Sequence, residues 1–398
     1  MKVVQINTFN YKATGSIMMN LHNSMQNNGI ESYVVWGRGK KSNSKYEISM
    51  EDYIGVRIHG FFTRVFDLTG FLSIRATKKL IQQLKKIKPD IVHLHNLHGY
   101  YLNINLLFNY LKKEQIKVIW TLHDCWAFTG HCAYFEMIKC QKWKTGCYKC
   151  KQKNTYPSSE IFDNSKWNYK KKKELFSNLN ITIVTPSNWL ANLVKESFMS
   201  NYSTKVINNG IDLSIFKPVK SNFKKENKIE NKTIILGVAS EWTERKGLKD
   251  FIRLSEILPE KYKIVLIGLT AEQAKKVPES IIKIQRTNNV QELVEIYSAA
   301  DVFFNPTYED NYPTTNIEAL SCGVPVYTYP AGGSSECLID NRCGDIIPYG
   351  DFNTLITKLD RCKSKKETLK INSSKIRCEL SKEKMINSYI DLYRSIGD

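Results

Sequence analysis

The sequence predicts an α/β protein with two domains, each built on a doubly wound parallel β-sheet with helices on both faces. Short β-branched runs alternate with amphipathic helical segments along the whole chain, which is the pattern of parallel βαβ units. The 398 residues exceed what one hydrophobic core usually organises, and the Lys- and Asn-rich segment 217–232 interrupts the alternation. We therefore expect a first domain at 1–216, a linker at 217–232, a second domain at 233–380, and a C-terminal helix at 381–398 that packs back on the first domain.

The first domain is expected to begin with a strand. Its opening run, KVVQIN, alternates and is soon followed by polar residues, which is typical of a strand rather than of a secretion signal. A turn is expected around Gly15, and then a helix that ends at Asn28-Gly29, because Asn and Gly favour the end of a helix. Further strands are expected at SYVVWG, DIVHLHN, KVIWTLHD, ITIVTPS and KVINNGI.

The second domain repeats the alternation, with strands expected at TIILGVAS, KIVLIG, VFFNP and VPVYTYP. In parallel sheets, ligands bind outside the carboxyl ends of the strands, so the polar and glycine residues that follow the strands are candidates for a site. Across both domains these residues are Gly15, His123-Asp124, Asn209-Gly210, Ser240-Glu241, Gly268 and Asp310.

Composition bounds the class of protein. Hydrophobic residues make up 42% of the chain, which is enough for a packed interior, and no apolar stretch is long enough to span a bilayer. We therefore expect a cytoplasmic protein. The 58 Lys and Arg against 39 Asp and Glu give a net charge of +19, which indicates a polyanionic partner: nucleic acid, anionic lipid head groups or phosphorylated substrates. Lysines that only cover solvated faces are the alternative.

The segment 305–326, NPTYEDNYPTTNIEALSCGVPV, is the densest candidate site. A strand ends at Pro306, an acidic loop follows, and a helix begins near Thr314, whose free N–H groups suit a diphosphate. Asp310 in the loop and Glu318 one turn into the helix can point into the same cleft, where two carboxylates can hydrogen-bond sugar hydroxyls and a ribose diol. A purely structural, salt-bridged Glu318 is the alternative.

This segment resembles the signature of the retaining GT-B glycosyltransferases of family four, in which an acidic residue is followed by seven positions, then Glu, and then EAL-x-CGVPV. The resemblance implies the GT-B fold, which is two Rossmann-like domains facing a cleft. In that family the helix Glu binds the nucleotide ribose and the first acidic residue contacts the donor sugar, which implies these roles for Glu318 and Asp310. The family usually has Glu in place of Asp310, and here Glu309 stands one place before it. Asn316 is also expected in the donor site.

Further segments resemble the same family in the expected order. LGVASEWTERKGL at 236–248 is similar to its phosphate-binding loop, with Arg245 and Lys246 as the cationic pair. The family usually places an Arg six residues before that Lys, where this chain has Ser240, so we expect Arg245 to supply the second charge. Such cations stabilise the charge that develops on a departing nucleoside diphosphate. INNGIDLSIFKP, AGGSSE and CGDIIPYGD resemble the family's hinge segment and later glycine loops.

In the first domain, TLHDCWAFTGHC at 121–132 places His123 and Asp124 at the end of a strand. A His at this place in similar enzymes lies near the donor sugar and the acceptor hydroxyl, so the resemblance implies a catalytic role for His123, with Asp124 as a candidate beside it. Gly15 would let the backbone approach the donor phosphates or the acceptor closely. Three more histidines near the preceding strand are expected to be wall or loop residues: His93, His95 and His98.

Four of the ten cysteines lie within nineteen residues of an expected insertion at about 125–155: Cys132, Cys140, Cys147 and Cys150. Four thiolates in a short loop match a closed tetrahedral zinc site, for which Cys125 and His131 could also supply ligands. Reduced packing cysteines, or cysteines able to form disulfides, are the alternatives. The loop, with its GHC, KW and GC-x-x-C pieces, resembles a branch of glycosyltransferases from bacterial exopolysaccharide and lipopolysaccharide clusters.

Residues 57–88 interleave Phe, Leu and Ile with Arg and Lys. Such a basic amphipathic stretch can lie among lipid head groups and draw the protein to an anionic membrane surface. A pair of ordinary core-facing helices with solvated lysines is the alternative.

Taken with the resemblance, these residues predict a retaining glycosyltransferase that needs no catalytic metal. It would move a hexose or related sugar from a UDP- or GDP-sugar to a lipid-linked oligosaccharide or a lipopolysaccharide or capsule acceptor, at the inner face of the cytoplasmic membrane. A nucleotide-sugar epimerase or hydrolase on the same fold is one alternative. A basic, zinc-bearing nucleic-acid-binding protein is another; it would explain the charge and the cysteines but leaves 305–326 unexplained, so no nucleic acid is expected as a partner.

Overall fold

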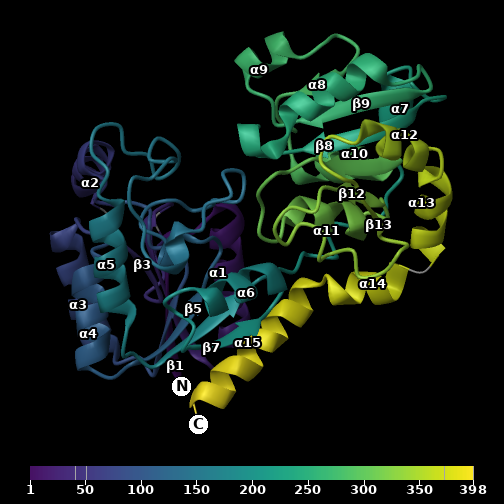
Figure 1. Ribbon diagram of the computed structural model, residues 1–398. Coiled ribbons are helices and arrows are strands. Elements are labelled where there is room, and N and C mark those ends of the chain that lie inside the picture. Colours follow the sequence, from purple (N-terminus) through teal and green to yellow (C-terminus); the bar gives the residue numbers. More distant parts are fainter. Residues whose placement is uncertain (41, 51, 372, 398) are drawn as a thin grey trace. The chain divides into compact units, whose positions relative to one another are not determined.

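The computed structural model describes residues 1–40, 42–50, 52–371 and 373–397. The chain divides into two compact units: unit 1 comprises Met1–Ile207 with Ile386–Asp398, and unit 2 comprises Asn208–Met385. Residue 398, the last of the expected C-terminal helix, lies outside the described residues. Each unit carries its own parallel sheet with helices packed on it, as Figure 1 shows, so the predicted fold class is confirmed.

Unit 1 is built on a seven-stranded parallel sheet in the order β3-β2-β1-β4-β5-β6-β7. The strand order reverses between β1 and β4, which is where open parallel sheets bind their ligands. The first strand is buried along almost its whole length, as expected for the centre of a sheet covered on both faces. The strands are β1 (Lys2–Phe9), β2 (Glu31–Arg38), β3 (Glu47–Ser49), β4 (Ile91–Leu94), β5 (Lys117–Thr121), β6 (Ile181–Thr185) and β7 (Ser203–Val206).

Six α-helices and two short 3₁₀ turns of the described chain accompany this sheet before β7, and α3, α4 and α5 lie side by side in Figure 1. They are α1 (Lys12–Asn27), α2 (Tyr53–Phe66), α3 (Ile74–Ile87), α4 (Ile104–Lys113), η1 (Trp126–Phe128), η2 (Lys142–Lys144), α5 (Ser165–Phe176) and α6 (Asn188–Glu196). None of the helices in the described part of the chain is both long and apolar enough to cross a membrane.

The start of α1 differs from the expected turn. The helix already begins at Lys12, so Gly15 lies in its first turns, while its end at Asn28, followed by Gly29 with φ +72°, is as expected. A Cβ on Gly15 would lie 2.7 Å from the carbonyl oxygen of Phe9. The glycine is therefore needed because the helix backbone packs directly on the end of β1, and not because the chain turns there.

Unit 2 is built on a six-stranded parallel sheet in the order β10-β9-β8-β11-β12-β13, and its order reverses between β8 and β11. The strands are β8 (Thr233–Val238), β9 (Tyr262–Ile267), β10 (Ile282–Ile284), β11 (Val302–Asn305), β12 (Val326–Thr328) and β13 (Gly344–Ile346). The helices are α7 (Phe223–Glu226), η3 (Glu244–Lys246), α8 (Leu248–Ile257), α9 (Ala271–Lys276), α10 (Val290–Ala299), α11 (Thr314–Ser321), α12 (Phe352–Leu359), α13 (Cys362–Ile371), α14 (Ser373–Glu379) and α15 (Lys382–Gly397).

The segment expected to be a linker, 217–232, belongs to unit 2, because the division between the units falls after Ile207. It contains α7, which contacts α10, and Phe223 packs against the core of unit 2. Ile229 is also buried there. Three apolar side chains of this polar segment, Val219, Phe223 and Ile229, thus dock it on the sheet domain.

Helix α15 begins in unit 2 and ends in unit 1. Within unit 1, the hydroxyl of Tyr393 lies 2.6 Å from Nδ1 of His93, and the hydroxyl of Tyr389 lies 3.0 Å from Oγ1 of Thr121. Both tyrosines are buried, so the end of the chain supplies polar partners to residues of the central strands.

Candidate active site

The strongest polar contact at the β8–β11 reversal of unit 2 joins Lys246 and Asp310. The Nζ of Lys246 lies 2.5 Å from Oδ2 of Asp310, and both side chains are mostly buried. The next residue, Gly247, has φ +74°, and a Cβ there would lie 2.2 Å from the carbonyl oxygen of Pro306. Only glycine allows this left-handed turn with such a close approach, and the turn carries Lys246 to the acidic loop after β11.

Arg245 ties the same two loops together. Its Nη1 donates to the carbonyl oxygen of Glu309 at 2.7 Å, and its own carbonyl accepts from the backbone N–H of Tyr308 at 2.8 Å. The backbone N–H of Gly333, in the AGGSSE segment, donates to the carbonyl of Asp310 at 3.1 Å. The structure therefore brings Arg245, Lys246, Glu309 and Asp310 to one place, beside a glycine loop.

Glu318 is half-buried on α11, and its Oε2 accepts a hydrogen bond from the hydroxyl of Tyr297 at 2.9 Å. Burial raises the pKa of Glu318 to about 6, against the opposing effect of hydrogen bonds from Tyr297 and Thr314. At neutral pH the carboxylate is ionised and can accept hydrogen bonds from a diol. Asn316 differs, because it is fully buried and its amide is used internally, by Ser334 at 2.8 Å and Asn305 at 2.8 Å.

In unit 1, His123 and Asp124 follow β5, as expected, and both are half-buried. Oδ2 of Asp124 lies 2.9 Å from Nε2 of His98, and Oδ1 accepts from the backbone N–H of Trp126 at 2.9 Å. Burial alone would raise the pKa of Asp124, but the charge and hydrogen bond of His98 and the N–H of Trp126 hold it below its usual value. This carboxylate is therefore ionised throughout the neutral range.

His123 contacts another histidine rather than Asp124. Its Nε2 lies 3.2 Å from Nδ1 of His95, whose Nε2 lies 3.3 Å from Oε1 of Gln5. Burial lowers the pKa of His123 to about 4, so its imidazole is neutral at pH 7 and can exchange hydrogen bonds with a hydroxyl group. A cavity of about 10 Å³, the size of one water, is lined by His95, His98, His123 and Asp124.

The structure separates the roles of the three histidines that the sequence grouped as wall or loop residues. His93 is buried in β4 between Tyr393 and Thr121, while His98 pairs with Asp124 and also lies 3.0 Å from the hydroxyl of Tyr156. The structure thus places His98 beside Asp124 in the candidate site, where the sequence predicted only a wall or loop residue. The sequence contained one indication of this. Several histidines lie in and just after β4, and β4 pairs with β5, whose carboxyl end carries His123 and Asp124.

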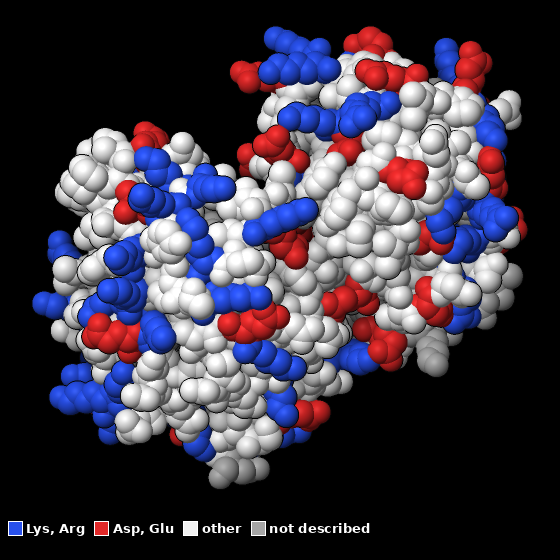
Figure 2. Space-filling view, viewed as in Figure 1, with Lys and Arg blue, Asp and Glu red and all other residues white. Residues whose placement is uncertain are grey.

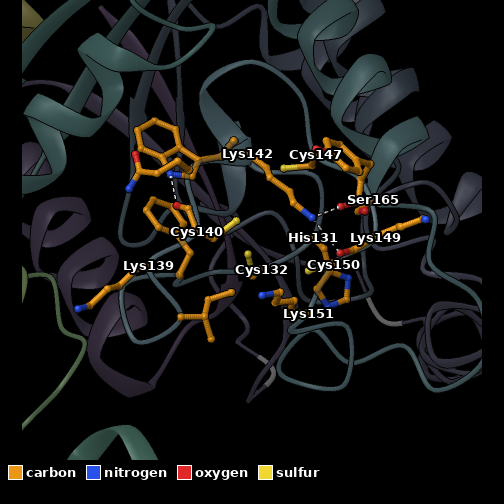
Figure 3. Close-up of a pocket in the computed structure, with 15 residues that line it drawn as sticks. His131, Cys132, Lys139, Cys140, Lys142, Cys147, Lys149, Cys150, Lys151 and Ser165 are labelled. Atoms are coloured by element: carbon orange, nitrogen blue, oxygen red, sulfur yellow. Dashed lines mark hydrogen bonds between the residues drawn. The ribbon is translucent and has the colours of Figure 1, made fainter.

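The cysteine cluster lies in the segment between η1 and α5. Cys132, Cys140, Cys147 and Cys150 line one pocket of about 210 Å³, shown in Figure 3. All ten cysteines are free thiols. With the side chains as they stand, no three His, Cys, Asp or Glu residues of the described ranges are arranged to hold a metal ion. The zinc site stays a prediction.

Comparison with solved structures identifies the fold. Sucrose-phosphate synthase from Thermosynechococcus elongatus matches with a TM-score of 0.71 at 15% identity, covering 99% of this chain and 98% of that one. Anabaena Alr3699/HepE in complex with UDP-glucose matches with a TM-score of 0.68 at 13% identity, covering 99% and 100%. The fold is that of the GT-B glycosyltransferases.

Sequence comparison then gives the family. The description "Glycosyltransferase Family 4" matches residues 14–215 and "Glycosyl transferases group 1" matches residues 219–376. The chain belongs to glycosyltransferase family 4, and the predicted enzyme class is confirmed. A putative colanic acid biosynthesis glycosyl transferase, WcaC of Escherichia coli K12, is 25% identical and covers 96% of each chain. An N,N'-diacetylbacillosaminyl-diphospho-undecaprenol alpha-1,3-N-acetylgalactosaminyltransferase of Campylobacter jejuni is 26% identical over 44% of this chain and 46% of its own.

Proposed function

We propose that this glycosyltransferase moves a sugar from a UDP- or GDP-sugar, with retention of configuration, to a lipid-linked or polysaccharide acceptor in the synthesis of a bacterial surface polysaccharide. The observation that carries the proposal is the pair of cations, Arg245 and Lys246, held against the acidic loop at the β8–β11 reversal. The UDP-glucose complex of HepE supports a uridine donor, and the names of WcaC and of the Campylobacter transferase support the acceptor class.

In the proposed binding of the sugar donor, Lys246 changes its partner from Asp310 to the diphosphate. Without donor, its ammonium is neutralised by Asp310. A diphosphate offers Lys246 and Arg245 a stronger acceptor, and Asp310 is then free to accept hydrogen bonds from sugar hydroxyls. Glu318 takes the ribose diol. As the bond between the anomeric carbon and the phosphate oxygen breaks, both cations stabilise the charge left on the nucleoside diphosphate.

The acceptor half rests on the neutral state of His123. An uncharged imidazole can orient a hydroxyl group without repelling the positive charge that develops on the sugar. We assign no protein base: the acceptor hydroxyl forms its bond to the anomeric carbon on the face that the phosphate leaves, and its proton goes to the departing phosphate oxygen. Asp124, held by His98, is a fixed negative charge beside this histidine.

Helix α2 supports contact with a membrane. Its buried residues are polar, His59 and Thr63, while its exposed residues are mostly apolar, with Arg57 and Arg64 among them. The exposed fractions are 70% for Tyr53, 74% for Ile54, 50% for Ile58 and 62% for Phe61. Helix α3 is the reverse, because Leu80 and Leu84 pack into the core. Of the basic stretch 57–88, the α2 half exposes most of the apolar side chains, and Ile74 at the start of α3 is 50% exposed as well.

The charge of the chain lies on the same unit. Unit 1 holds 31 Lys and Arg against 15 Asp and Glu, a net +16, whereas unit 2 holds 27 against 24, a net +3. Figure 2 shows Lys and Arg spread over unit 1 on the face in view. Basic residues near an anionic membrane each contribute about 1 kcal/mol, so the unit that carries α2 also carries the charge that would hold it at phosphatidylglycerol head groups.

Transfer is tested with radiolabelled UDP- and GDP-sugars and an extract of bacterial undecaprenyl-linked lipids as acceptor. We expect one donor class to label the lipid fraction, NMR of the product to show the anomer of the donor, and Lys246→Gln to slow labelling by about 100-fold. Inversion of the anomer would refute retention, and labelling unaffected by Lys246→Gln would refute the donor assignment.

Membrane contact is tested by sedimentation with vesicles that contain phosphatidylglycerol or only phosphatidylcholine. The double variant Ile54→Ser/Phe61→Ser should lose binding to the anionic vesicles. The matched control replaces two exposed apolar residues of unit 2, Ile257→Ser/Val290→Ser, and should bind as the wild type does. Equal binding by both double variants would refute the role of α2.

A further inference from the structure

The segment between η1 and α5, residues 129–164, contains only one 3₁₀ turn, η2, as regular structure. Connections of this length without helices or strands are uncommon in compact domains and need something else to hold them. The segment is nonetheless well packed, with Trp143 buried against Phe128 and Phe135. The segment also contacts the candidate site directly, because Tyr156 near its far end lies against His98.

Four thiols surround one pocket inside this segment. Cys132 hydrogen-bonds Cys150, and the Sγ of Cys147 accepts from the backbone N–H of Gly130 at 3.1 Å. Figure 3 shows all four cysteines, Cys132, Cys140, Cys147 and Cys150, around the same cavity of about 210 Å³. A Cβ on Gly130 would lie 2.6 Å from the Cβ of Cys147, so the glycine is required for this N–H to reach the sulfur.

Positive and hydrogen-donating groups face the thiols from neighbouring elements. The side chain of Lys172 on α5 is buried, donates to the carbonyls of Trp126 at 2.8 Å and Thr129 at 3.1 Å, and lies near enough to Cys132 and Cys147 to interact with their charge. In the described ranges it forms no ion pair with a carboxylate. A buried amino group thus lies beside two of the four sulfurs.

His131 adds a second such group. It lines the same pocket, its Nδ1 is fixed by Asp67 at 2.6 Å, and both side chains are buried. Its Nε2 is buried without a well-formed hydrogen bond to any described residue. Asp67 is thus occupied by His131 and is not a full partner for Lys172. Four cysteines and the imidazole of His131 therefore line one pocket, and the buried Lys172 lies beside two of the sulfurs.

From these contacts we infer that Cys132, Cys140, Cys147 and Cys150 bind one structural Zn²⁺. Binding displaces four thiol protons to solvent and forms four Zn–S bonds, and the centre carries a net charge of −2. The sulfurs do not converge on one point as the side chains stand, so the cysteines turn about χ1 when the ion binds. The ion closes the segment on itself and so fixes the loop that carries Tyr156.

The first test is metal analysis of the full-length protein, purified without chelator or metal-affinity resin and measured by mass spectrometry. We expect one zinc ion per chain, and intense sulfur-to-metal charge-transfer absorption after replacement by Co²⁺. Protein that contains no zinc, and still takes up none when Zn²⁺ is added with reductant present, would overturn the inference. An intact mass lower by two hydrogens per bond would show disulfides in place of the metal site, and would overturn it also.

The second test compares cysteine variants. Cys147→Ser/Cys150→Ser removes the C-x-x-C pair and should lose the zinc, whereas Cys378→Ser, an exposed cysteine of unit 2, should keep it. Zinc retained in full by the double variant would overturn the ligand set. Since zinc content is measured without any assay of transfer, the result stands apart from the outcome for the glycosyltransferase reaction.

Discussion

Replacing Glu318 by Gln separates the effect of this carboxylate on the stability of the fold from its role in nucleotide binding. The side chain accepts a hydrogen bond from Tyr297 at 2.9 Å, and burial raises its pKa from an ordinary 4.5 to about 6. A Gln carbonyl keeps the bond from Tyr297 and removes the charge. We expect Glu318→Gln to be more stable than the wild type at neutral pH and to bind the nucleotide poorly, because the ribose loses its ionised acceptor.

The magnitude follows from proton linkage. Since the folded pKa lies above the unfolded one, the folded chain holds the proton more tightly, and the free energy of unfolding falls as the pH rises from 4.5 to 6. At 1.36 kcal/mol per pH unit, the cost is about 2 kcal/mol above pH 6 and fades below pH 4.5. For a unit of this size, the gain in Tm of Glu318→Gln should be about 3 to 6 °C larger at pH 7.5 than at pH 4.5.

The assay is thermal unfolding followed by tryptophan fluorescence at both pH values, with and without UDP and GDP. Saturation at 100 times Kd stabilises a protein by about 2.7 kcal/mol, so the nucleotide that binds the wild type gives a clear shift, and the variant should lose most of it. The control is Glu256→Gln, which alters an exposed carboxylate on α8. A gain in Tm that is the same at both pH values, or equal in the control, would refute the argument from burial. A variant that keeps the full nucleotide shift would refute the ribose assignment.

Three further variants test the loops around the donor site. Lys246→Met should lower kcat by about 100-fold, the effect of one lost electrostatic donor, and equal turnover would contradict a role in leaving-group stabilisation. Asp310→Asn should lower kcat far more than it weakens nucleotide binding, as measured by steady-state kinetics beside calorimetry, because its charge serves the sugar and not the diphosphate. Gly247→Ala should lower the free energy of unfolding by more than about 1 kcal/mol and raise KM for the donor. The reason is that φ is +74° and the added Cβ would collide with the carbonyl oxygen of Pro306. An unchanged Tm would contradict the strained turn.

The parallel strands could be predicted from the sequence because buried strands are continuous apolar runs that end in polar residues. KVVQINTF became β1 and TIILGV became β8, each with nearly every residue buried. The 305–326 segment could be predicted for a related reason. Its helix follows its strand directly, so residues that are neighbours in the sequence remain neighbours at the strand end.

Errors arose where a few contacts outweighed local composition. Segment 217–232 is polar on average, but Val219, Phe223 and Ile229 pack it on unit 2. Gly15 favours a turn by propensity, yet the same small residue is required for the close packing of α1 on β1. In the first case the free energy comes from contacts with distant parts of the chain, and in the second from close packing against the end of the preceding strand.

The sequence by itself determined the two parallel-sheet units, the family, and the cationic and acidic residues of the proposed donor segment. These depend on short-range sequence patterns, which are the same however the helices and strands are arranged in space. Only the tertiary structure decided that His98 lies 2.9 Å from Asp124, that Asn316 is buried inside unit 2, and that α2 leaves several apolar side chains exposed. Each of these depends on which side chains from neighbouring strands and helices lie against the residue. Burial and hydrogen-bond partners are shared between residues far apart in the chain, and the fold alone sets that sharing.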